Sequence, residues 1–425
     1  MQEKPQHTDF DLVIVGGGMV GLSLAVALGR YREGQQDEQK LKIAVIEAVA
    51  SNAKHQPSFD ARTVALAYGT KRIFQMMGIW EAIEEQGVTP IKKINVSDRG
   101  HLGSIQLDSK HENVPALGYV TETRNLGLVL RQAVEQIDNV TLFCPAQLVK
   151  LNVDSDRARL TVKFYNEEIN ISSRLVIAAD GGNSQVRTQT GIKTFKVDYE
   201  QYAIIANVEM AQSHNNIAYE RFTSSGPMAL LPARNVDNEE NLFALVWTVK
   251  TQDRDKVLEL SDDEFLRQLQ QRFASRIKGF VKVGQRHVYP LSWMQSREHY
   301  RPRLAIIGNA AHTMHPVAGQ GFNLGLRDVA AIAEVVVDAI GQGEDIGSVQ
   351  VLRRYAKWRQ RDQMQTALST DSIVRIFSNS FPPLTLVRNI GLTLLDMTPG
   401  LKHKLARHAM GFAGKLPRLA RGLPL

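Results

Sequence analysis

Short apolar runs, each followed by a glycine turn and a helical pattern, recur along the chain. Residues 12–15 form the first run, and glycines lead from it into an apolar helical stretch over 22–30. A polar loop over 33–40 then reaches a second run over 43–46. Runs that are apolar at every position are typical of parallel strands covered on both faces. The pattern therefore predicts a βαβ unit near the N-terminus.

Two more segments, far away in the sequence, follow the same pattern. Residues 175–179 form an apolar run that turns at Asp180-Gly181 and enters a helix near residue 184. Residues 304–307 form another run, and the helix after its loop places these apolar residues on one face: Leu326, Val329, Ala330, Ala333, Val336 and Val337. Three such turns can meet at the carboxyl edge of one parallel sheet. We therefore predict an α/β, Rossmann-like domain.

The middle of the chain has a different pattern. Four short segments are β-rich and partly alternating, namely residues 201–208, 218–222, 228–232 and 242–248, which predicts a second, mainly β domain. We predict three parts: a discontinuous cofactor domain over 1–190 and 290–375, a β-rich substrate domain over 191–289, and a helical, basic C-terminal region over 376–425.

The first glycine turn has the spacing of a dinucleotide site. Gly16, Gly18 and Gly21 form G-x-G-x-x-G, and Glu47 ends the second strand. The first glycine permits a tight turn, the second lets the backbone approach a pyrophosphate, and the third lets the helix pack on the strand. The helix N-terminus stabilises phosphate charge, and an acid at this strand end can bind ribose hydroxyls. The strand, helix and acid around the motif make a purely structural glycine turn the weaker interpretation.

Composition adds few constraints. The 425 residues are 22% charged and 43% hydrophobic, with a net charge of +7, as in globular proteins. Cys144 is the single cysteine, which excludes an internal disulfide and is typical of a reducing compartment. The apolar stretch over 12–28 lacks the basic start and cleavage site of a signal peptide, and no apolar run is long enough to span a membrane. Basic residues do not cluster with stacking aromatics, so we expect no nucleic-acid partner.

Taken together, these motifs resemble a known family. G-x-G-x-x-G with Glu47, the Asp180-Gly181 turn, and G-N-A-A-H-x-x-x-P-x-x-G-Q-G over 308–321 resemble the three fingerprints of the flavoprotein aromatic hydroxylases, which have a para-hydroxybenzoate hydroxylase-like fold. The resemblance covers nearly the whole chain. Further stretches resemble the ubiquinone-biosynthesis branch that hydroxylates methoxyphenols: residues 59–66, 96–101, 220–223 with 226–227, and 320–325.

The resemblance implies FAD as the cofactor and assigns residues to it. Gly308 and Asn309 would lie at the flavin ribityl chain, where the wider family usually has Asp after the glycine; an Asn still accepts a hydrogen bond, without charge assistance. Gly319, Gln320 and Gly321, with Phe322 and Asn323 after them, would open a helix under the flavin ring. Pro316 would lie along the ring face. Arg62 and Asn125 match positions near FAD in relatives.

The resemblance also implies the chemistry. NADPH or NADH would act as a transient reductant of FAD without a separate domain. Reduced FAD and O2 would form a C4a-hydroperoxide that hydroxylates an electron-rich phenol, here 2-polyprenyl-6-methoxyphenol in ubiquinone biosynthesis. Three alternatives stay open. One is hydroxylation of another ring position or another aromatic lipid, another is a dehydrogenase that needs no O2, and the third is a non-catalytic flavoprotein that organises a quinone-synthesis complex.

Several residues have more than one interpretation. His312 and His315 are spaced like a metal pair but lack further ligands, so we expect no metal. Arg62 has a structural salt bridge as its alternative role, and Asp180 has a helix cap. The apolar residues Met228, Leu230 and Trp247 either line the substrate cavity or pack in a core.

The C-terminal part mixes apolar residues with bases: Arg388, Lys402, Lys404, Arg407, Lys415, Arg418 and Arg421. This charge pattern favours peripheral contact with an anionic membrane or with a multiprotein ubiquinone-biosynthesis complex. The alternative is a helical face docked on the cofactor domain. We expect a cytoplasmic protein, with contact at the inner membrane as an open possibility.

Overall fold

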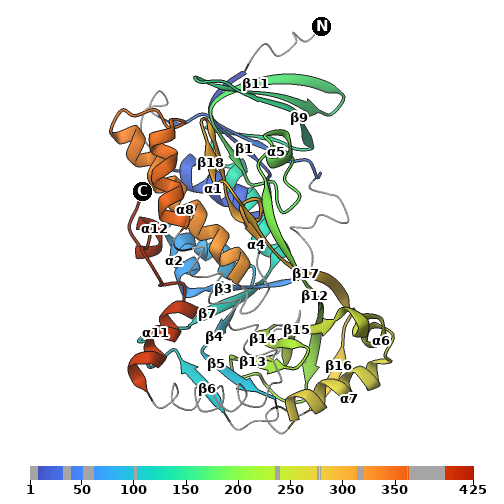
Figure 1. Cartoon of the computed structure of the whole chain (residues 1–425). Coiled ribbons are helices and arrows are strands. Elements are labelled where there is room, and N and C mark those ends of the chain that lie inside the picture. The colour runs from blue at the N-terminus through green and yellow to red at the C-terminus, as the bar shows by residue number, and fades with distance from the viewer. Residues whose placement is uncertain are drawn as a thin grey trace.

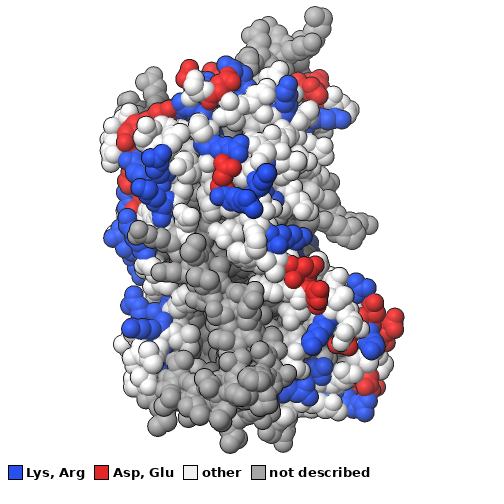
Figure 2. Space-filling model, in the orientation of Figure 1, with Lys and Arg blue, Asp and Glu red and all other residues white. Residues whose placement is uncertain are grey.

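The computed structural model describes residues 8–31, 40–50, 62–99, 103–234, 240–274, 277, 279–313, 320–360, 362 and 398–425. Two large sheets lie one above the other and are connected by the long strands β12 and β17 (Figure 1). Acidic and basic side chains are intermixed over much of the visible face (Figure 2). No helix among the described residues is long and apolar enough to cross a membrane.

The upper sheet is the predicted parallel sheet. Its strand order is β18-β19-β11-β1-β2-β8, and β11, β1, β2, β8 and β19 run parallel where they pair. The bounds are β1 Thr8–Val15, β2 Ile43–Ile46, β8 Val140–Phe143, β11 Glu167–Ala178, β18 Tyr300–Arg301 and β19 Leu304–Ile306. The antiparallel strands β9 (Ala146–Val153) and β10 (Ala158–Phe164) continue from β11. The strands predicted over 12–15, 43–46, 175–179 and 304–307 are confirmed.

Both faces of this sheet are buried, which explains its continuous apolar runs. Leu12 and Ile14 face a core formed with helices, whereas Val13 and Val15 face a second core closed by β9 and β10. The helices on the first face include α1 (Met19–Gly29), α4 (Thr123–Glu135) and α8 (Gln320–Gly341). The six apolar residues predicted on one face of α8 are buried there.

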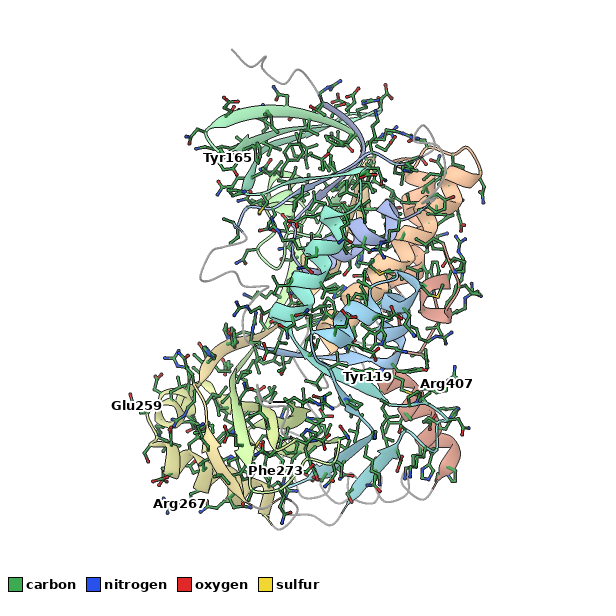
Figure 3. The ribbon with its side chains drawn as sticks, turned by 180° about the vertical axis from the view of Figure 1, so that it is seen from behind. Tyr119, Tyr165, Glu259, Arg267, Phe273 and Arg407 are labelled. Atoms are coloured by element: carbon green, nitrogen blue, oxygen red, sulfur yellow. The ribbon has the colours of Figure 1, made fainter. Side chains whose placement is uncertain are left out.

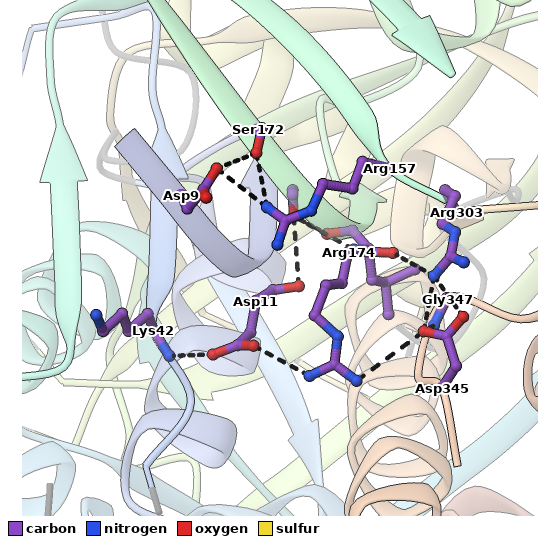
Figure 4. A network of polar contacts seen from close by, with 11 residues as sticks. Asp9, Asp11, Lys42, Arg157, Ser172, Arg174, Arg303, Asp345 and Gly347 are labelled. Carbon is purple, nitrogen blue, oxygen red and sulfur yellow. Dashed lines mark hydrogen bonds and ion pairs between the residues drawn. The ribbon is translucent and has the colours of Figure 1, made fainter. Parts of the chain in front are cut away.

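Polar contacts connect the strands near their amino ends (Figure 4). Asp11 of β1 accepts a hydrogen bond from Arg174 of β11 at 3.1 Å and another from the backbone N–H of Lys42 at 3.0 Å. Arg303, just before β19, binds Asp345 at 2.6 Å. Exposed ion pairs contribute little singly, but these contacts join neighbouring strands at the edge opposite the glycine turns.

The lower sheet is antiparallel for the most part, with the order β20-β17-β12-β15-β14-β13-β5-β6 and β16 beside β12. Its strands are β5 Lys93–Asp98, β6 Ser104–Asp108, β12 Thr194–Met210, β13 Ile217–Thr223, β14 Gly226–Ala233, β15 Leu242–Lys250, β16 Phe280–Val283, β17 His287–Ser296 and β20 His312–Thr313. The four strands predicted in the middle of the chain all lie in this sheet. The sheet also extends beyond the range 191–289, because β5, β6 and β20 come from the segments on either side.

Short elements connect the two sheets. Strands β3 (Thr63–Ala67), β4 (Thr89–Ile91) and β7 (Gly118–Glu122) form a small sheet between them. Helices α2 (Tyr68–Met76), α3 (Trp80–Glu85) and α5 (Gln185–Gln189) belong to the upper part, and α6 (Arg254–Leu258) and α7 (Asp262–Phe273) cover the lower sheet. Phe273 of α7 points into the core under this sheet (Figure 3).

The C-terminal segment lies along one side of the molecule, where α12 is above α11 (Figure 1). Helix α11 (Pro399–Ala409) packs on β6 through Ala406 and Met410, and α12 (Arg418–Arg421) lies against α2 and α8. Arg418 forms ion pairs with Glu334 and Asp338 of α8. The predicted docking alternative therefore holds for α12, whereas α11 keeps an exposed basic side.

Candidate active site

The predicted turns meet at the carboxyl edge of the upper sheet. The backbone N–H of Gly16, after β1, donates to Ile46 O at 2.8 Å, and that of Ala179, after β11, donates to Val15 O at 2.8 Å. Ile307 N, after β19, donates to Ala178 O at 3.0 Å. Loops that lie more than a hundred residues apart in the sequence therefore start side by side.

The first loop needs its glycines for close backbone contacts. Gly16 has φ +106°, and a Cβ there would lie 2.5 Å from Ala179 O. A Cβ at Gly21 would lie 1.9 Å from Gly16 O. Gly18 is extended and precedes the first turn of α1, so the free N–H groups of this helix point toward the loop.

Glu47 closes the first loop from the end of β2. Its Oε2 accepts the backbone N–H of Gly17 at 2.6 Å, and its Oε1 accepts that of Val49 at 2.8 Å. The carboxylate is thereby fixed beside the glycine turn. Each carboxylate oxygen has two lone pairs, so Glu47 keeps acceptor capacity for ribose hydroxyls.

In the second loop, Asp180 adopts the capping role that was its alternative. Its Oδ2 accepts the N–H of Val186 at 3.0 Å, next to the Ser184 cap of α5. Burial raises the pKa of Asp180, against the hydrogen bonds from Ser184 and Val186. Its Oδ1 is buried and has no partner among the described residues. One oxygen therefore holds the helix, and the other is a buried acceptor beside the second loop.

Arg187 is a residue that the sequence reasoning did not select. Its guanidinium is buried and donates to Ala310 O at 2.5 Å and to Gly182 O. Burial lowers its pKa, and the charge of Asp180 opposes this. Arg187 thus connects the second loop to the third. A signal was present in the sequence, because an Arg on the first turn of a short helix after Asp-Gly is well placed to reach the loops.

The third loop begins at Gly308, which has φ +58°. Residues 308–310 form a tight turn closed by Ala311 N to Gly308 O at 2.8 Å, and Asn309 is exposed at its tip. Asn309, which was predicted to contact the ribityl chain, is therefore exposed at the end of the sheet. Pro316, Gly319 and His315 lie outside the described residues.

Helix α8 begins at Gln320, as predicted. A Cβ at Gly321 would meet no described residue within 4 Å, so the described part of the chain leaves space over this first turn. Phe322 stacks on Phe74 with ring centroids 6.3 Å apart. The Asn323 side chain accepts from Ala67 N and Thr70 Oγ1 and donates to Ala65 O. Its side chain therefore joins α8 to β3 and α2.

Arg62 and Asn125 lie near each other at the start of α4. Thr123 N, on the first turn of α4, donates to Arg62 O at 2.8 Å. The Arg62 guanidinium lies 4.7 Å from the ring centroid of Tyr289, on β17 of the lower sheet. Asn125 donates to Gln86 O at 3.0 Å. Arg62 is thus placed between the two sheets.

His312 belongs to a buried ionic network. Its Nε2 lies 2.7 Å from Oδ2 of Asp328, whose Oδ1 accepts Arg359 Nε at 2.6 Å. Among the described residues, no group of three potential ligands could hold a metal ion. Asp328 and Arg359 were not predicted as site residues from the sequence. Arg359 lies in a helical segment far from any motif.

The substrate candidates Met228, Leu230 and Trp247 lie in a core. All three are fully buried in a cluster with Phe265 of α7. The structure therefore supports core packing for these residues rather than a cavity lining. Strand alternation turns their neighbours to the opposite face.

The opposite face of the lower sheet carries partly exposed apolar residues. Ile205, Val246 and Ala229 are register partners across β12, β15 and β14. Leu231 and Ala218 of the same face pack against β4 and β7. This face is therefore turned toward the small sheet of β3, β4 and β7, which lies between the two large sheets.

The residues present fit FAD. The Gly16–Gly21 turn excludes side chains where a pyrophosphate would approach, Glu47 offers a fixed carboxylate, and the residues that the structure describes leave space over Gly181 and Gly321. Asn309 adds an exposed polar side chain from the third loop, and Asp180 adds a buried carboxylate oxygen from the second. Such an elongated edge matches a dinucleotide better than a small ligand.

Comparison with known proteins gives the same result. The FAD binding domain family matches residues 9–367. The ubiquinone hydroxylase UbiL of Rhodospirillum rubrum is 35% identical over 98% of this chain and 93% of the relative. The 3-demethoxyubiquinol 3-hydroxylase of Escherichia coli is 32% identical over 94% of this chain and 98% of the relative. The p-nitrophenol 4-monooxygenase PnpA of Pseudomonas putida has the same fold, with a TM-score of 0.76 at 18% identity over 96% of this chain and all of PnpA.

The fold and the converging loops thus define an FAD-dependent monooxygenase. The chain belongs to the FAD binding domain family and, within it, to the branch of the ubiquinone-biosynthesis hydroxylases. The α/β fold class, the family resemblance and FAD as the cofactor, all predicted from the sequence, are confirmed.

Proposed function

We propose that the protein hydroxylates the aromatic ring of a polyprenylated phenol, 2-polyprenyl-6-methoxyphenol, in ubiquinone biosynthesis, with NAD(P)H and O2 as co-substrates. The observation that supports this most directly is the pairing of a dinucleotide edge with an apolar sheet face. FAD would be held by the loops after β1, β2, β11 and β19, and the phenol by the face that carries Ile205 and Val246.

The protein's own residues bind the substrate and keep water out of the site. Bound FAD, reduced by NAD(P)H, would supply the activation of O2 and the oxygen atom that enters the ring. Ile205, Val246 and Ala229 offer an apolar surface for an electron-rich ring and its prenyl chain and keep water from the reacting atoms. Arg62, fixed over Tyr289, is placed to favour the phenolate.

One relative favours a second candidate within the same class. The Escherichia coli protein is named for hydroxylation of a 3-demethoxyubiquinol, so hydroxylation at another ring position is the alternative. The two candidates differ in the oxygen pattern of the ring that is bound. A mass spectrum of the product decides between them.

The test is NADPH oxidation in air by the purified, FAD-loaded protein. A short-chain 2-prenyl-6-methoxyphenol and a short-chain demethoxyubiquinol are compared as substrates. We expect substrate-dependent O2 uptake and a product heavier by one oxygen atom with the methoxyphenol. Turnover of the demethoxyubiquinol alone would favour the second candidate. A flavin-loaded protein that hydroxylates neither would contradict a free-standing enzyme and favour a protein that works inside a complex.

We also propose that the protein works at a membrane surface or in a membrane-bound assembly. The exposed side of α11 carries Lys404 and Arg407 next to Leu401, which is 49% exposed. Arg407 points outward from α11 (Figure 3). A basic side with an apolar residue is typical of peripheral binding to anionic lipids, and a prenylated substrate resides in the bilayer.

A further inference from the structure

A chain of buried charges lies directly behind the third loop. Asp328 of α8 is completely buried, and Arg359, in the helical segment 349–360, is 1% exposed. Asp328 Oδ1 accepts Arg359 Nε at 2.6 Å. Its Oδ2 accepts two further hydrogen bonds, from His312 Nε2 at 2.7 Å and from the backbone N–H of Gly308 at 3.0 Å. These contacts join the carboxylate to the loop and to its counter-ion.

Burying such a network costs desolvation free energy. A buried ion pair often stabilises a fold no more than apolar residues of similar volume do. Burial alone would raise the pKa of Asp328, but its contacts with His312 and with the Arg359 guanidinium lower it well below its usual range. Asp328 is therefore ionised. A charge retained at this cost indicates a requirement for geometry rather than for stability.

The geometry in question is the turn at Gly308. Its φ of +58° is held by two contacts, Ala311 N to Gly308 O and Gly308 N to Asp328 Oδ2. The next residue is Asn309, exposed at the tip of the turn. Rotation of the Gly308 peptide would move Asn309 first. Asp328, which is itself buried, thus controls the position of the exposed residue Asn309.

The network extends away from the loop as well. Arg359 and Arg327 both bind Asp362, Arg327 at 3.0 Å. Gly414 of the C-terminal segment lies against Asp362, because a Cβ at Gly414 would be 3.5 Å from its Oδ1. The carboxylate that holds the turn is therefore anchored on two helices and supported from the C-terminal side.

We propose that Asp328 is a positioning residue for the flavin, which acts by fixing the Gly308 turn so that Asn309 meets the bound cofactor. This inference rests on FAD binding within the proposed function but not on the identity of the phenol. A measurement of flavin binding therefore tests this inference separately from the identity of the substrate.

The experiment measures FAD binding to the full chain. Asp328→Asn removes the charge while keeping the shape, and we expect FAD affinity to fall at least tenfold, together with a shift of the flavin reduction potential. The matched control is Asp345→Asn, which breaks the Arg303–Asp345 pair in the same domain, away from the loops. We expect FAD affinity within twofold of wild type for that control.

A second variant separates positioning from folding. The double variant Asp328→Leu with Arg359→Met replaces the ion pair by apolar groups, a change that is often neutral for stability. We expect a folded protein with weakened FAD binding and an altered flavin potential. A folded double variant, or a folded Asp328→Asn variant, with wild-type affinity and potential would overturn the proposal. If the single variant does not fold, the double variant decides alone.

Discussion

Ile205 and Val246 lie directly opposite each other on β12 and β15, on the face of the lower sheet that packs against β4 and β7. Their neighbours in sequence, Ile204 and Trp247, are opposite each other on the other face and are fully buried. The pair therefore marks the boundary between a surface that can receive a substrate and a core that cannot.

The first prediction concerns the face that can receive a substrate. Val246→Phe adds bulk beside Ile205 without entering the core, so we expect the KM for the prenylated phenol to rise about tenfold, as a misfit of 1–2 kcal/mol would give. FAD affinity should not change. Steady-state kinetics and a flavin titration of the same preparation check this, and an unchanged KM would remove this face from the substrate site.

The second prediction concerns the core face. Met228 is fully buried next to Trp247 in strand register. Met228→Ala should lower the free energy of unfolding by about 2–5 kcal/mol because it leaves a cavity. The KM should stay as in the wild type. Urea unfolding of both proteins measures the loss, and a raised KM with normal stability would return Met228 to the cavity lining.

These two faces show what the sequence could determine. The strands over 201–208 and 242–248 were predictable because β-branched and aromatic residues alternate there. The sequence could not predict which face of these strands packs on a helix. Both faces carry apolar residues, and a shift of one residue exchanges them. The partners of Arg187 and Asp328 were not predictable either. The Asp-Gly turn places Arg187 near the loops, but its bond to Ala310 O joins segments 123 residues apart. Asp328 likewise binds the Gly308 N–H and the side chains of His312 and Arg359, and no local pattern encodes such contacts.

The third prediction concerns Glu47. Glu47→Ala removes the acceptor of the Gly17 N–H bond at 2.6 Å and the expected ribose contacts. Hydrogen bonds to a charged group contribute about 1.5–3 kcal/mol, so FAD should bind about 10- to 100-fold more weakly. Glu47→Gln keeps an acceptor, so its FAD affinity should lie between that of the wild type and that of Glu47→Ala. The control is Glu344→Ala, which removes an exposed ion pair with Arg354. Equal FAD affinity in all four proteins would exclude a cofactor role for Glu47.

The fourth prediction concerns pH. Burial lowers the pKa of His299 to about 4, with the charges of His312 and Arg359 acting in the same direction and that of Asp328 against it. Above the unfolded pKa of about 6.5, His299 is neutral in both states. As the pH falls from there toward 4, the unfolded chain binds a proton that the folded protein does not, so stability is lost, up to about 3 kcal/mol for this shift.

The His299 effect can be isolated by difference. His299→Gln cannot titrate, so its unfolding free energy should fall less steeply than that of the wild type between pH 6.5 and 4. His287→Gln, at an exposed position, should keep the wild-type slope. Urea unfolding at several pH values gives both slopes. Parallel curves for the wild type and His299→Gln would show that His299 does not contribute.

The fifth prediction concerns lipid binding by α11. Figure 2 shows Lys and Arg along the edge of the molecule where Figure 1 places the C-terminal helices. Arg418 and Lys415 are engaged there, in ion pairs with α8 and in contact with the Trp358 ring respectively. Lys404 and Arg407 remain exposed on α11. Each basic residue near an anionic surface contributes about 1 kcal/mol.

The triple variant Lys402→Ala, Lys404→Ala, Arg407→Ala should therefore bind vesicles of phosphatidylcholine with phosphatidylglycerol about 100-fold more weakly than the wild type. The control removes the same charge at Lys193, Lys196 and Lys256, away from α11, and should bind like the wild type. Binding should weaken with salt, since exposed charges are screened over about 8 Å at physiological ionic strength. If both triple variants bind anionic vesicles equally, net charge alone attracts the protein. If neither they nor the wild type bind, the prenylated substrate must reach the sheet face through a partner protein rather than directly from the bilayer.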